Sequence, residues 1–482
     1  MGFLFSKQKR TVFSRKVKGF WEEFSHNKIG LVGLAMIFFY VFLAFAAPLL
    51  TQYDPNREWG LASGWSMPEW VRILPEFKNY PTTMEPSLDW TVAQDSDLVS
   101  VTPLDDGFVA EYSGNKSATI AIQASFPYTH VAPDEFLFDF IWDSQAVETK
   151  IFIETYIVSP WGVEYIVWSS YKDKTVMPSF TSKNISSLVA AIRSEALAPK
   201  IYDRLGVPSH QNVAKKFFME KGDYKWKFKI VFKPTSDGTV KISVTDVRFK
   251  IPGLVHGILG TDHLGGDIWS QLVWGTQISL AVGLMAAALG TSIGILVGII
   301  TGFVGGIVDD VAMRIVDILL CLPVLPLLLG FFMLWGPNVF YLVLLIAVFG
   351  WQGLSRLVRS QVLSLKEMPF IECSRAAGAS KYHIMLKHLL PNVIPVALAS
   401  LVLSVPGAIL TEAALSFIGF GDPLVPTWGR MLNHAFNYGA FRFLSWHWIL
   451  PPGVALTTLT LSFVFVGHAV DEIVNPRLRR RR

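Results

Sequence analysis

The sequence predicts a mainly α-helical protein that crosses a membrane several times and carries an inserted β-rich domain. Of its 482 residues, 51% are hydrophobic and only 17% are charged, whereas soluble chains usually carry about a quarter charged residues. Six apolar stretches approach or reach the roughly 20 residues that cross a bilayer. Residues 54–255 contain no such stretch and show the alternation of strands instead.

The six predicted membrane spans share an apolar composition with few charges. They cover about residues 29–50, 278–301, 315–334, 340–350 with flanking residues, 393–414 and 449–470. The first ends in a cleavage-like stretch, 45–48, but its apolar core is longer than that of a signal peptide and a basic segment precedes it. We therefore interpret residues 29–53 as an uncleaved anchor.

The orientation follows from the basic residues near the ends of the spans. Residues 1–28 contain seven Lys and Arg residues, and others gather in the 356–392 loop and in the 477–482 tail. Because such residues are retained on the cytoplasmic side, we expect both termini and this loop to be cytoplasmic, and residues 54–255 extracytoplasmic. Apolar residues at helical spacing in 11–27 predict an interfacial amphipathic helix, with an ordinary basic leader as the alternative.

The inserted region is predicted to be β-rich, with a sandwich as one possible arrangement. Four apolar residues alternate with lysines, which indicates a strand with one buried face: Trp226, Phe228, Ile230 and Phe232. An Asp237-Gly238 turn and a second alternating run predict a hairpin. Further strands are expected near 136–142, 151–158 and 165–168, and a helix near 185–198.

The charge of this region changes sign along the chain. Residues 54–164 have a balance of −13, and residues 165–250 a balance of +9. This pattern fits either a docking surface for a charged partner or an ordinary solvated surface. The two histidines of the domain, His130 and His210, have no nearby catalytic partners in sequence. Cys321 and Cys373 are isolated thiols and form neither a disulfide framework nor a zinc site.

The loop between the fourth and fifth spans carries helix signals outside the membrane. Pro369 can open a helix, and Glu372 then lies in its first turn, where negative charge is favoured. Gly378 permits a sharp reversal, and a second helix would run from Ser380 towards Pro391. A short helix, a turn and a second helix would suit a partner's groove; a basic connector is the alternative.

This loop resembles the cytoplasmic coupling motif of type I ABC importer permeases. That motif reads Glu-Ala-Ala, three residues, Gly, nine residues, Ile, one residue, Leu-Pro. The matching positions here are Glu372, Gly378, Leu390 and Pro391. Cys373 and Ser374 replace the two alanines, and His388 replaces the isoleucine. The resemblance implies that the residues contacting the ATPase are Glu372, Cys373, Ser374, Arg375, Gly378, Lys381 and Pro391.

Other stretches resemble the dipeptide/oligopeptide/nickel branch of these permeases. They are 260–267, 275–280, 302–317, 412–421 and 471–478, and the first span with its Asn27-Lys28 lead-in is similar to the second-permease type. The chain departs from that branch at Gly266 and Gln277, where arginine is common, and in the length of the inserted region. The resemblance assigns residues 256–476 to the permease core, with a coupling loop at 358–392.

The resemblance implies a non-catalytic permease of an importer in the bacterial inner membrane, with peptides as the expected substrate. Nickel chelates or modified peptides are alternatives. Two ATP-binding cassette ATPases would carry ATP and Mg²⁺, and this chain no cofactor. The other implied partners are a second, different permease, an extracytoplasmic substrate-binding protein and the lipid bilayer, but no nucleic acid. The sequence has no Gly-x4-Gly-Lys-Ser/Thr loop for ATP. An ion-gradient transporter and a membrane-anchored receptor are the competing classes.

Ionisable residues within spans are costly and often functional. Arg314 and Asp317 are three residues apart and could pair on one helix face. Glu412 either lines the translocation path or makes a packed polar contact. A stripe of glycines at Gly290, Gly294, Gly298 and Gly302 predicts close packing against another helix, in the bundle or at a subunit interface.

Overall fold

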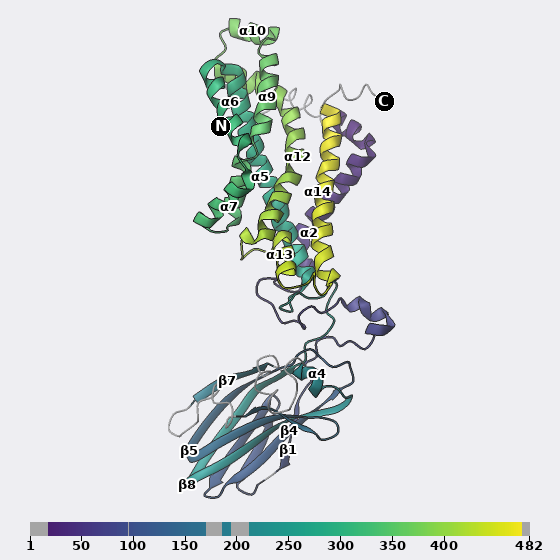
Figure 1. Cartoon of the computed structure of the whole chain (residues 1–482), viewed down its shortest axis with the longest axis vertical. Helices are drawn as coiled ribbons and strands as arrows, with labels where there is room; N and C mark the ends of the chain where they lie inside the picture. Colours follow the sequence, from purple (N-terminus) through teal and green to yellow (C-terminus); the bar gives the residue numbers. More distant parts are fainter. Residues whose placement is uncertain (1–17, 95, 170–185, 194–211, 475–482) are drawn as a thin grey trace. The chain divides into compact units, whose positions relative to one another are not determined.

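The computed structural model describes residues 18–94, 96–169, 186–193 and 212–474. The chain divides into two compact units: a helical unit, formed by Met1–Glu58 and Ile268–Arg482, and an inserted unit, Trp59–Asp267 (Figure 1). Residues 1–17 and the basic tail 477–482 lie outside the described residues.

The helical unit consists of long apolar helices and several short ones. The bounds are α2 Lys28–Leu50, α5 Ile268–Val304, α6 Gly306–Cys321, α7 Val324–Trp335, α8 Val339–Val348, α9 Gln352–Leu365, α10 Pro369–Ala376, α11 Lys381–Ile384, α12 Leu390–Leu415, α13 Trp428–Asn437 and α14 Trp446–Val474. Two π-helical turns, Met385–Leu389 and Ser416–Phe420, lie at the two ends of α12. Residues 18–26 form a further helix, in which Phe24 is buried and Trp21 exposed.

Among the described residues, five helices are long and apolar enough to cross a membrane, or up to six if one bent pair is a single span. The bent pair is α6 and α7, whose axes differ by 87°. The break falls at Pro323, which lacks an N–H and precedes the first residue of α7. The predicted third span, 315–334, is therefore not one straight helix.

The fourth span extends further than predicted. α8 is followed by a short break and then by α9, and Val339–Leu365 together are long and apolar enough to cross a membrane. Arg356 and Arg359, which were assigned to the cytoplasmic loop, therefore lie within this span. The prediction was too short because the continuous apolar run of the sequence ends at the end of α8. The helix continues as α9, which is amphipathic and buries Ser355, Val358 and Val362.

The glycine stripe of α5 packs inside the bundle, against α8 and α9. A Cβ atom added at Gly298 would lie 2.6 Å from the Cβ of Val358, and one at Gly302 would lie 2.8 Å from the Cβ of Val362. A Cβ atom added at Gly290 would lie 3.4 Å from the carbonyl oxygen of Ala347 in α8. Small residues let the two backbones approach closely, so within this chain the stripe serves helix packing.

The inserted unit is β-rich, as predicted. Its strands are β1 Asp89–Gln94, β2 Val99–Leu104, β3 Gly107–Gly114, β4 Ala118–Tyr128, β5 Leu137–Val158, β6 Glu164–Ser169, β7 Ser186–Arg193 and β8 Gly222–Lys250, with a short helix α4, Val213–Phe217. All described strand pairs are antiparallel, in the order β1-β4-β8-β3-β2, and β5 pairs with β6, β7 and β8. The expected helix at 185–198 is wrong over Ser186–Arg193, which forms β7 beside β5.

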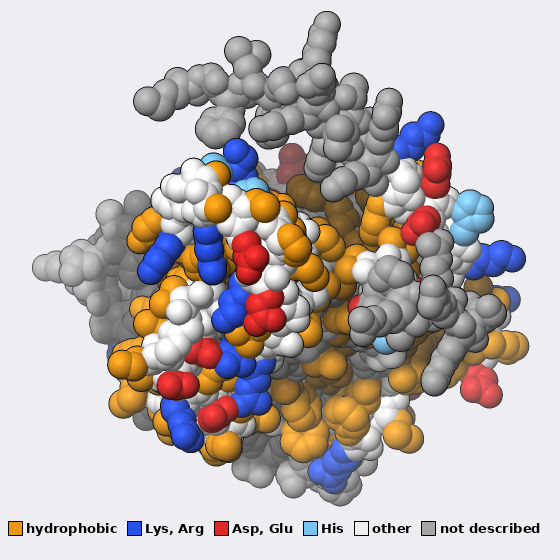
Figure 2. Space-filling model, turned by 90° about the horizontal axis from the view of Figure 1, so that it is seen from above, with side chains coloured by type: hydrophobic (Ala, Val, Ile, Leu, Met, Phe, Trp, Pro, Cys, Tyr) orange, Lys and Arg blue, Asp and Glu red, His pale blue; other side chains and the backbone are white. Residues whose placement is uncertain are grey.

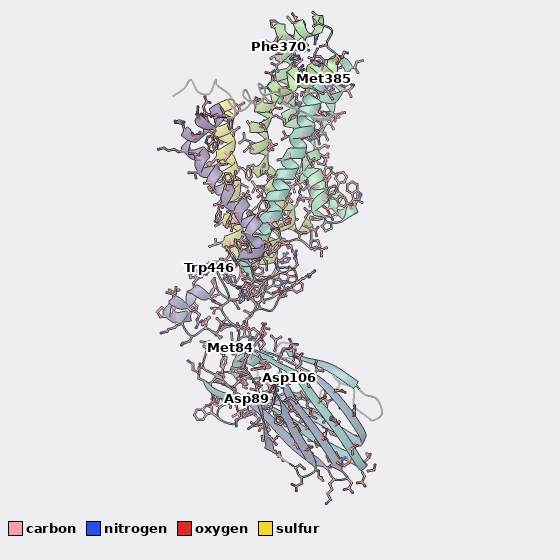
Figure 3. All side chains as sticks on the ribbon, turned by 180° about the vertical axis from the view of Figure 1, so that it is seen from behind. Met84, Asp89, Asp106, Phe370, Met385 and Trp446 are labelled. Carbon is pink, nitrogen blue, oxygen red and sulfur yellow. The ribbon has the colours of Figure 1, made fainter. Side chains whose placement is uncertain are left out.

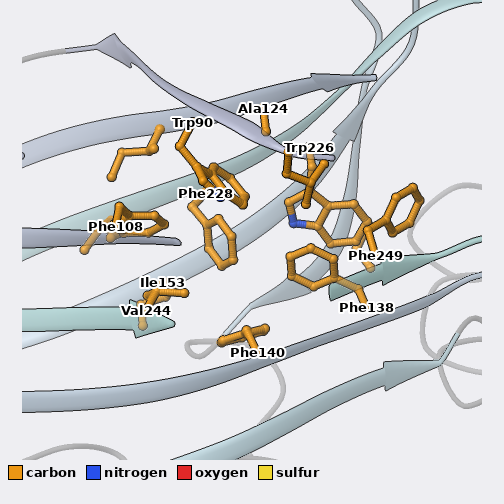
Figure 4. Close-up of a cluster of buried hydrophobic side chains, with 14 of the residues drawn as sticks. Trp90, Phe108, Ala124, Phe138, Phe140, Ile153, Trp226, Phe228, Val244 and Phe249 are labelled. Carbon is orange, nitrogen blue, oxygen red and sulfur yellow. The ribbon is translucent and has the colours of Figure 1, made fainter. Parts of the chain in front are cut away.

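Two long strands, β5 and β8, each contribute to two facing layers. The first half of β8 pairs with β4 and its second half with β3, while β5 follows both halves. The hairpin predicted at Asp237-Gly238 is therefore wrong, because the two alternating runs belong to one strand and pair with other strands. Phe138 lies beside Phe249 in the second half, yet it stacks on Trp226 of the first half with ring centroids 3.8 Å apart. The two halves therefore face each other across an aromatic core (Figure 4). This is the arrangement of a sandwich.

The lysines of β8 are balanced by carboxylates on the neighbouring strands. Lys229 and Lys241 lie directly opposite Glu154 and Glu111 in the strand register, with N–O distances of 4.0 and 2.7 Å. Opposite charges on facing strands stabilise the pair modestly. The change of charge sign along the sequence thus reflects which strands pair, and this favours the solvated surface over a docking face.

The two ends of the inserted unit meet each other. Met67 bridges to Val255, and the amide of Gly60 donates to the carbonyl of Leu264 at 2.9 Å. Because its entry and exit lie together, a domain of this kind can be inserted into a loop without separating the flanking helices.

Candidate functional site

The α10 segment forms as its sequence signals predict. Pro369 opens α10, Glu372 lies in its first turn, and Gly378 adopts a positive φ of 81° just after its end. The amide of Gly378 donates to the carbonyl of Arg375 at 2.9 Å. Ser380 then caps α11 by accepting from the amide of His383 at 3.3 Å. A short helix, a turn and a second helix therefore follow one another, as expected. The expected end of the second helix near Pro391 is wrong, because the helix continues through the π-helical turn Met385–Leu389 into α12.

α10 lies at one end of the helical unit. Phe370 and Met385 both occur at this end, and Trp446 marks the opposite end (Figure 3). Viewed towards the α10 end, acidic and basic side chains intermingle on the surface, with hydrophobic side chains around them (Figure 2). The start of α2 reaches the end of α14, where the Asn27 side-chain amide donates to Glu472 at 3.1 Å.

α10 is held to the bundle by one buried side chain. Ile371 is 0% exposed, and the other described residues of α10 are exposed or half-buried. Ile371 packs in a cluster that joins α10 to α5, α9, α11 and α12. The other buried members of the cluster are Ile299, Phe303, Val358, Val362, Ile384, Leu389 and Val393. A displacement of α10 would therefore act on α5, α9 and α12 through this cluster.

Two further contacts connect the α10 segment with its neighbours. The guanidinium of Arg375 lies over the ring of Phe303 in α5, 5.3 Å from its centroid, which is a cation–π geometry. The hydroxyl of Ser374 and Nε2 of His388 are 3.4 Å apart. His388 belongs to the π-helical turn Met385–Leu389, and such turns are frequent at functional sites.

Beneath α10, two ion pairs join α6 to α9. Arg359 donates through Nε and a terminal nitrogen to the two carboxylate oxygens of Asp309, both at 2.5 Å, and Asp309 is only 8% exposed. Arg356 pairs with Asp317. The expected pairing of Asp317 with Arg314 is therefore wrong, because a cation on the neighbouring helix takes the place of the one three residues earlier.

Glu412 lies where α12, the turn Ser416–Phe420 and α13 meet. Its side chain is 1% exposed, and its Oε1 accepts from the hydroxyl of Ser416 at 2.7 Å. Thr427, the N-cap of α13, is also close to the carboxyl group. Gly429 packs so tightly here that an added Cβ would lie 2.5 Å from the carbonyl oxygen of Ala413. Within this chain the carboxyl group is packed and does not reach the surface.

A hollow of about 320 Å³ lies between α5, α7, α8 and α12. Its walls are mainly apolar, and the polar groups come from α12 and α5: Ser400, Ser404, Thr411 and Thr291. The hydroxyls of Ser404 and Thr411 also donate to carbonyl oxygens of their own helix at 2.8 Å. Glu412 does not line this hollow, although it follows Thr411 directly.

The residues predicted for coupling lie together on α10 and the following turn. Glu372, Cys373, Arg375, Gly378 and Lys381 are exposed. Ser374 is half-buried against His388, and Pro391 is exposed in the first turn of α12.

Of the residues predicted within spans, Arg314 is exposed, Asp317 is paired, and Glu412 is buried. Sequence reasoning missed Ile371, Phe303 and the Asp309–Arg359 pair. Only the large aliphatic side chain of Ile371 in the short, partly polar helix α10 could have signalled its anchoring role.

Two family profiles match the chain. Residues 294–480 match the binding-protein-dependent transport system inner membrane component, and residues 17–65 match the N-terminal TM domain of oligopeptide transport permease C. Together with the long apolar helices, these matches define a membrane permease of the ATP-binding cassette importers. The chain belongs to the family of binding-protein-dependent transport system inner membrane components. Neither profile covers residues 66–293.

Relatives of the chain carry the names of peptide permeases. The dipeptide transport system permease protein DppC of Bacillus subtilis is 35% identical over 224 residues, which are 46% of this chain and 69% of that protein. A peptide transport system permease protein of Brucella suis is 31% identical over 245 residues, 51% of this chain and 81% of that protein. A chain of the inward-facing MetNI methionine ABC transporter is 22% identical, with a TM-score of 0.34, and covers 43% of this chain and 95% of that one.

Proposed function

We propose that this chain is one of two permease subunits of a peptide importer in the bacterial inner membrane. The names of its relatives support a peptide substrate. The partners proposed are two ATP-binding cassette ATPases, which would carry the ATP and Mg²⁺, a second permease and an extracytoplasmic substrate-binding protein. The chain itself is proposed to be non-catalytic and to need no cofactor.

The observation that carries this proposal is the construction of α10. α10 exposes most of its residues and has one buried side chain, Ile371. Such a helix can fit a groove of a partner and pass the partner's movement to the bundle. The proposed receiving elements are α5, α9 and α12, which meet Ile371 in one cluster. Glu372, Cys373, Lys381 and the residues between them would contact the ATPase, and Pro391 would begin the helix that responds.

The orientation proposed for the helical unit places α10 in the cytoplasm. Supporting it, six of the seven Lys and Arg residues of 1–28 precede α2 and the seventh is its first residue. The N-cap of α2, Asn27, bonds to the end of α14. Both termini would then be cytoplasmic and residues 54–255 extracytoplasmic. Residues 18–26 fit a helix at the membrane interface, since Trp21 is exposed while Phe24 packs on α14.

The intramembrane polar residues are proposed to have different roles. Glu412 would hold α13 against α12, because it is buried and bonded to Ser416. Asp317 would fasten α6 to α9 through Arg356, and Arg314, which is exposed, would face a partner or the interface. The side of α12 that carries Ser400, Ser404 and Thr411 is a better candidate for the translocation path than Glu412.

The test is to purify the tagged chain with its partners from the host membrane in mild detergent and to identify them by mass spectrometry. We expect the wild type and an Asp310→Ala control to recover an ATPase and a second permease. Asp310 is an exposed acidic residue on α6, so Asp310→Ala removes one negative charge, as Glu372→Ala does. The double variant Glu372→Ala, Gly378→Asp should recover the second permease without the ATPase.

Three results would overturn the proposal. Recovery of no ATPase with the wild type, under conditions that preserve a known importer of this class, would favour a gradient-driven transporter or a receptor. Equal recovery of the ATPase with the double variant would remove α10 from the contact. Uptake that continues after deletion of the partner ATPase would also contradict an ATP-driven importer.

A further inference from the structure

The inserted unit contains a pocket of about 410 Å³ that no proposed transport step uses. Its volume falls in the range of small-molecule sites, about 300–1,000 Å³. Trp59 and Trp65 line it, and they are 56% and 40% exposed. Another part of the lining comes from the sheet and includes Asp139 on β5 and Arg248 and Lys250 on β8. Two large aromatic side chains thus share one pocket with several hydrogen-bonding groups.

The loop that presents Trp65 is strained and firmly held. Trp65 has a φ of +59°, a left-handed conformation that costs a non-glycine residue about 1–2 kcal/mol. Its amide donates to the carbonyl of Asp262 at 2.9 Å, and the next amide, of Ser66, donates to the hydroxyl of Thr261 at 2.9 Å. Strain of this kind is often found at ligand sites. The bonds fix an aromatic residue at a position where its backbone is unfavourable.

The two basic groups that line the pocket are already compensated within the unit. Lys250 pairs with Glu85 at 3.7 Å, and Arg248 pairs with Asp246 at 2.7 Å. Asp139 lies directly opposite Arg248 in the strand register. A charged ligand would have to compete with these pairs, whereas a neutral ligand can bond to their remaining donors and acceptors. The pocket therefore favours a neutral ligand with many hydrogen-bonding groups.

We propose that this pocket binds a neutral saccharide of about one or two sugar units. A sugar ring has an apolar face of C–H groups, which can lie on the flat face of an indole. Its hydroxyl groups both donate and accept, so carboxylates and guanidinium groups can bind them together. Trp59 and Trp65 supply the flat faces, and Asp139, Arg248 and Lys250 supply the polar contacts. The site is separate from α10, and it does not depend on which molecule the helical unit transports.

The test is saturation-transfer difference NMR on the full-length chain in lipid nanodiscs. The probes are five disaccharides, offered separately: maltose, cellobiose, lactose, mannobiose and N,N′-diacetylchitobiose. We expect transfer from the protein to the ring protons of at least one of them. Trp59→Ala should weaken that binding about tenfold, because it removes one stacking surface.

The chain offers a matched control in Trp161. This residue is 78% exposed in the same unit and does not line the pocket, so Trp161→Ala should leave the transfer unchanged. Asp139→Asn keeps the side-chain shape and should also weaken binding. An unaltered near-ultraviolet circular dichroism spectrum would show that each variant keeps its packed core.

Three results would overturn the proposal. The first is the absence of transfer to every disaccharide of the panel. The second is binding that Trp59→Ala and Trp161→Ala reduce equally. The third is transfer to the dipeptide Ala-Ala and to no sugar, which would assign the pocket to peptides.

Discussion

The glycine stripe of α5 gives a prediction whose magnitude can be worked from the structure. In Gly298→Ala the new methyl carbon would lie 2.6 Å from the Cβ of Val358 and 2.7 Å from the carbonyl oxygen of Ser355. An ordinary contact begins at 3.4 Å, so α5 and α9 must separate by about 0.8 Å. Neither neighbouring atom can rotate away, because one is a Cβ and the other is backbone. Overpacking of this kind costs about 1–3 kcal/mol.

Part of that cost is offset, because alanine favours a helix over glycine by about 1 kcal/mol. We therefore expect a net loss of up to about 2 kcal/mol. A loss of 1 kcal/mol lowers the melting temperature by about 2–4 °C in a domain of roughly this size. The assay is thermal unfolding of the purified chain in detergent, followed by the helical signal in far-ultraviolet circular dichroism.

Gly453→Ala in α14 is the matched control. It makes the same change in a long helix, but no heavy atom of a neighbour lies within 4 Å of the added Cβ. We expect it to hold or raise the melting temperature. If Gly298→Ala is as stable as Gly453→Ala, the close approach of α5 and α9 is not as described, and the reasoning fails.

Three other predictions follow from the same structure. Gly378→Ala should weaken association with the ATPase, because alanine at a φ of +81° costs about 1 kcal/mol, while Gly378→Asn should weaken it less. Arg359→Ala should destabilise the helical unit by about 3 kcal/mol, because it leaves Asp309 buried without its partner. Arg356→Ala removes a more exposed ion pair and should cost under about 1 kcal/mol. Equal losses of stability for the two variants in thermal unfolding would contradict this. Burial lowers the pKa of His256 below 6.5, so the fold favours the neutral ring. The inserted unit should therefore have its full stability above about pH 6.5 and lose stability as the pH drops below that value. The His256→Gln variant should lose less stability over the same pH range. Thermal melts followed by intrinsic fluorescence at successive pH values would measure both.

The sequence predicted the elements whose signals are local. Alternation in Trp226, Phe228, Ile230 and Phe232 indicated a strand with one buried face, and all four side chains are 0% exposed in β8. Pro369 and Gly378 bounded α10 correctly because they act through their own backbone. Hydrophobic length found the spans that α2, α5, α12 and α14 form, since a bilayer requires a minimum length.

What the sequence did not predict depends on contacts between distant segments. β7 reads locally as a helix, but β5 supplies a strand for it to pair with. Asp317 has a cation three residues away, yet it pairs with Arg356 on α9. The bend between α6 and α7 is the exception, because Pro323 was visible in the sequence and signals a break there.

The most direct measurement uses Cys373 on α10, which is exposed. With Cys321 changed to serine, Cys373 can carry a maleimide–benzophenone crosslinker, and the control carries the same crosslinker at Asp310→Cys, an exposed position of α6, in a chain that lacks both native cysteines. In the complex purified from the host membrane, we predict a light-induced crosslink from Cys373 to the ATPase subunit and none from the control position. Labelling at Cys373 that yields no ATPase crosslink, or yields no more than labelling of the control, would contradict α10 as the coupling element.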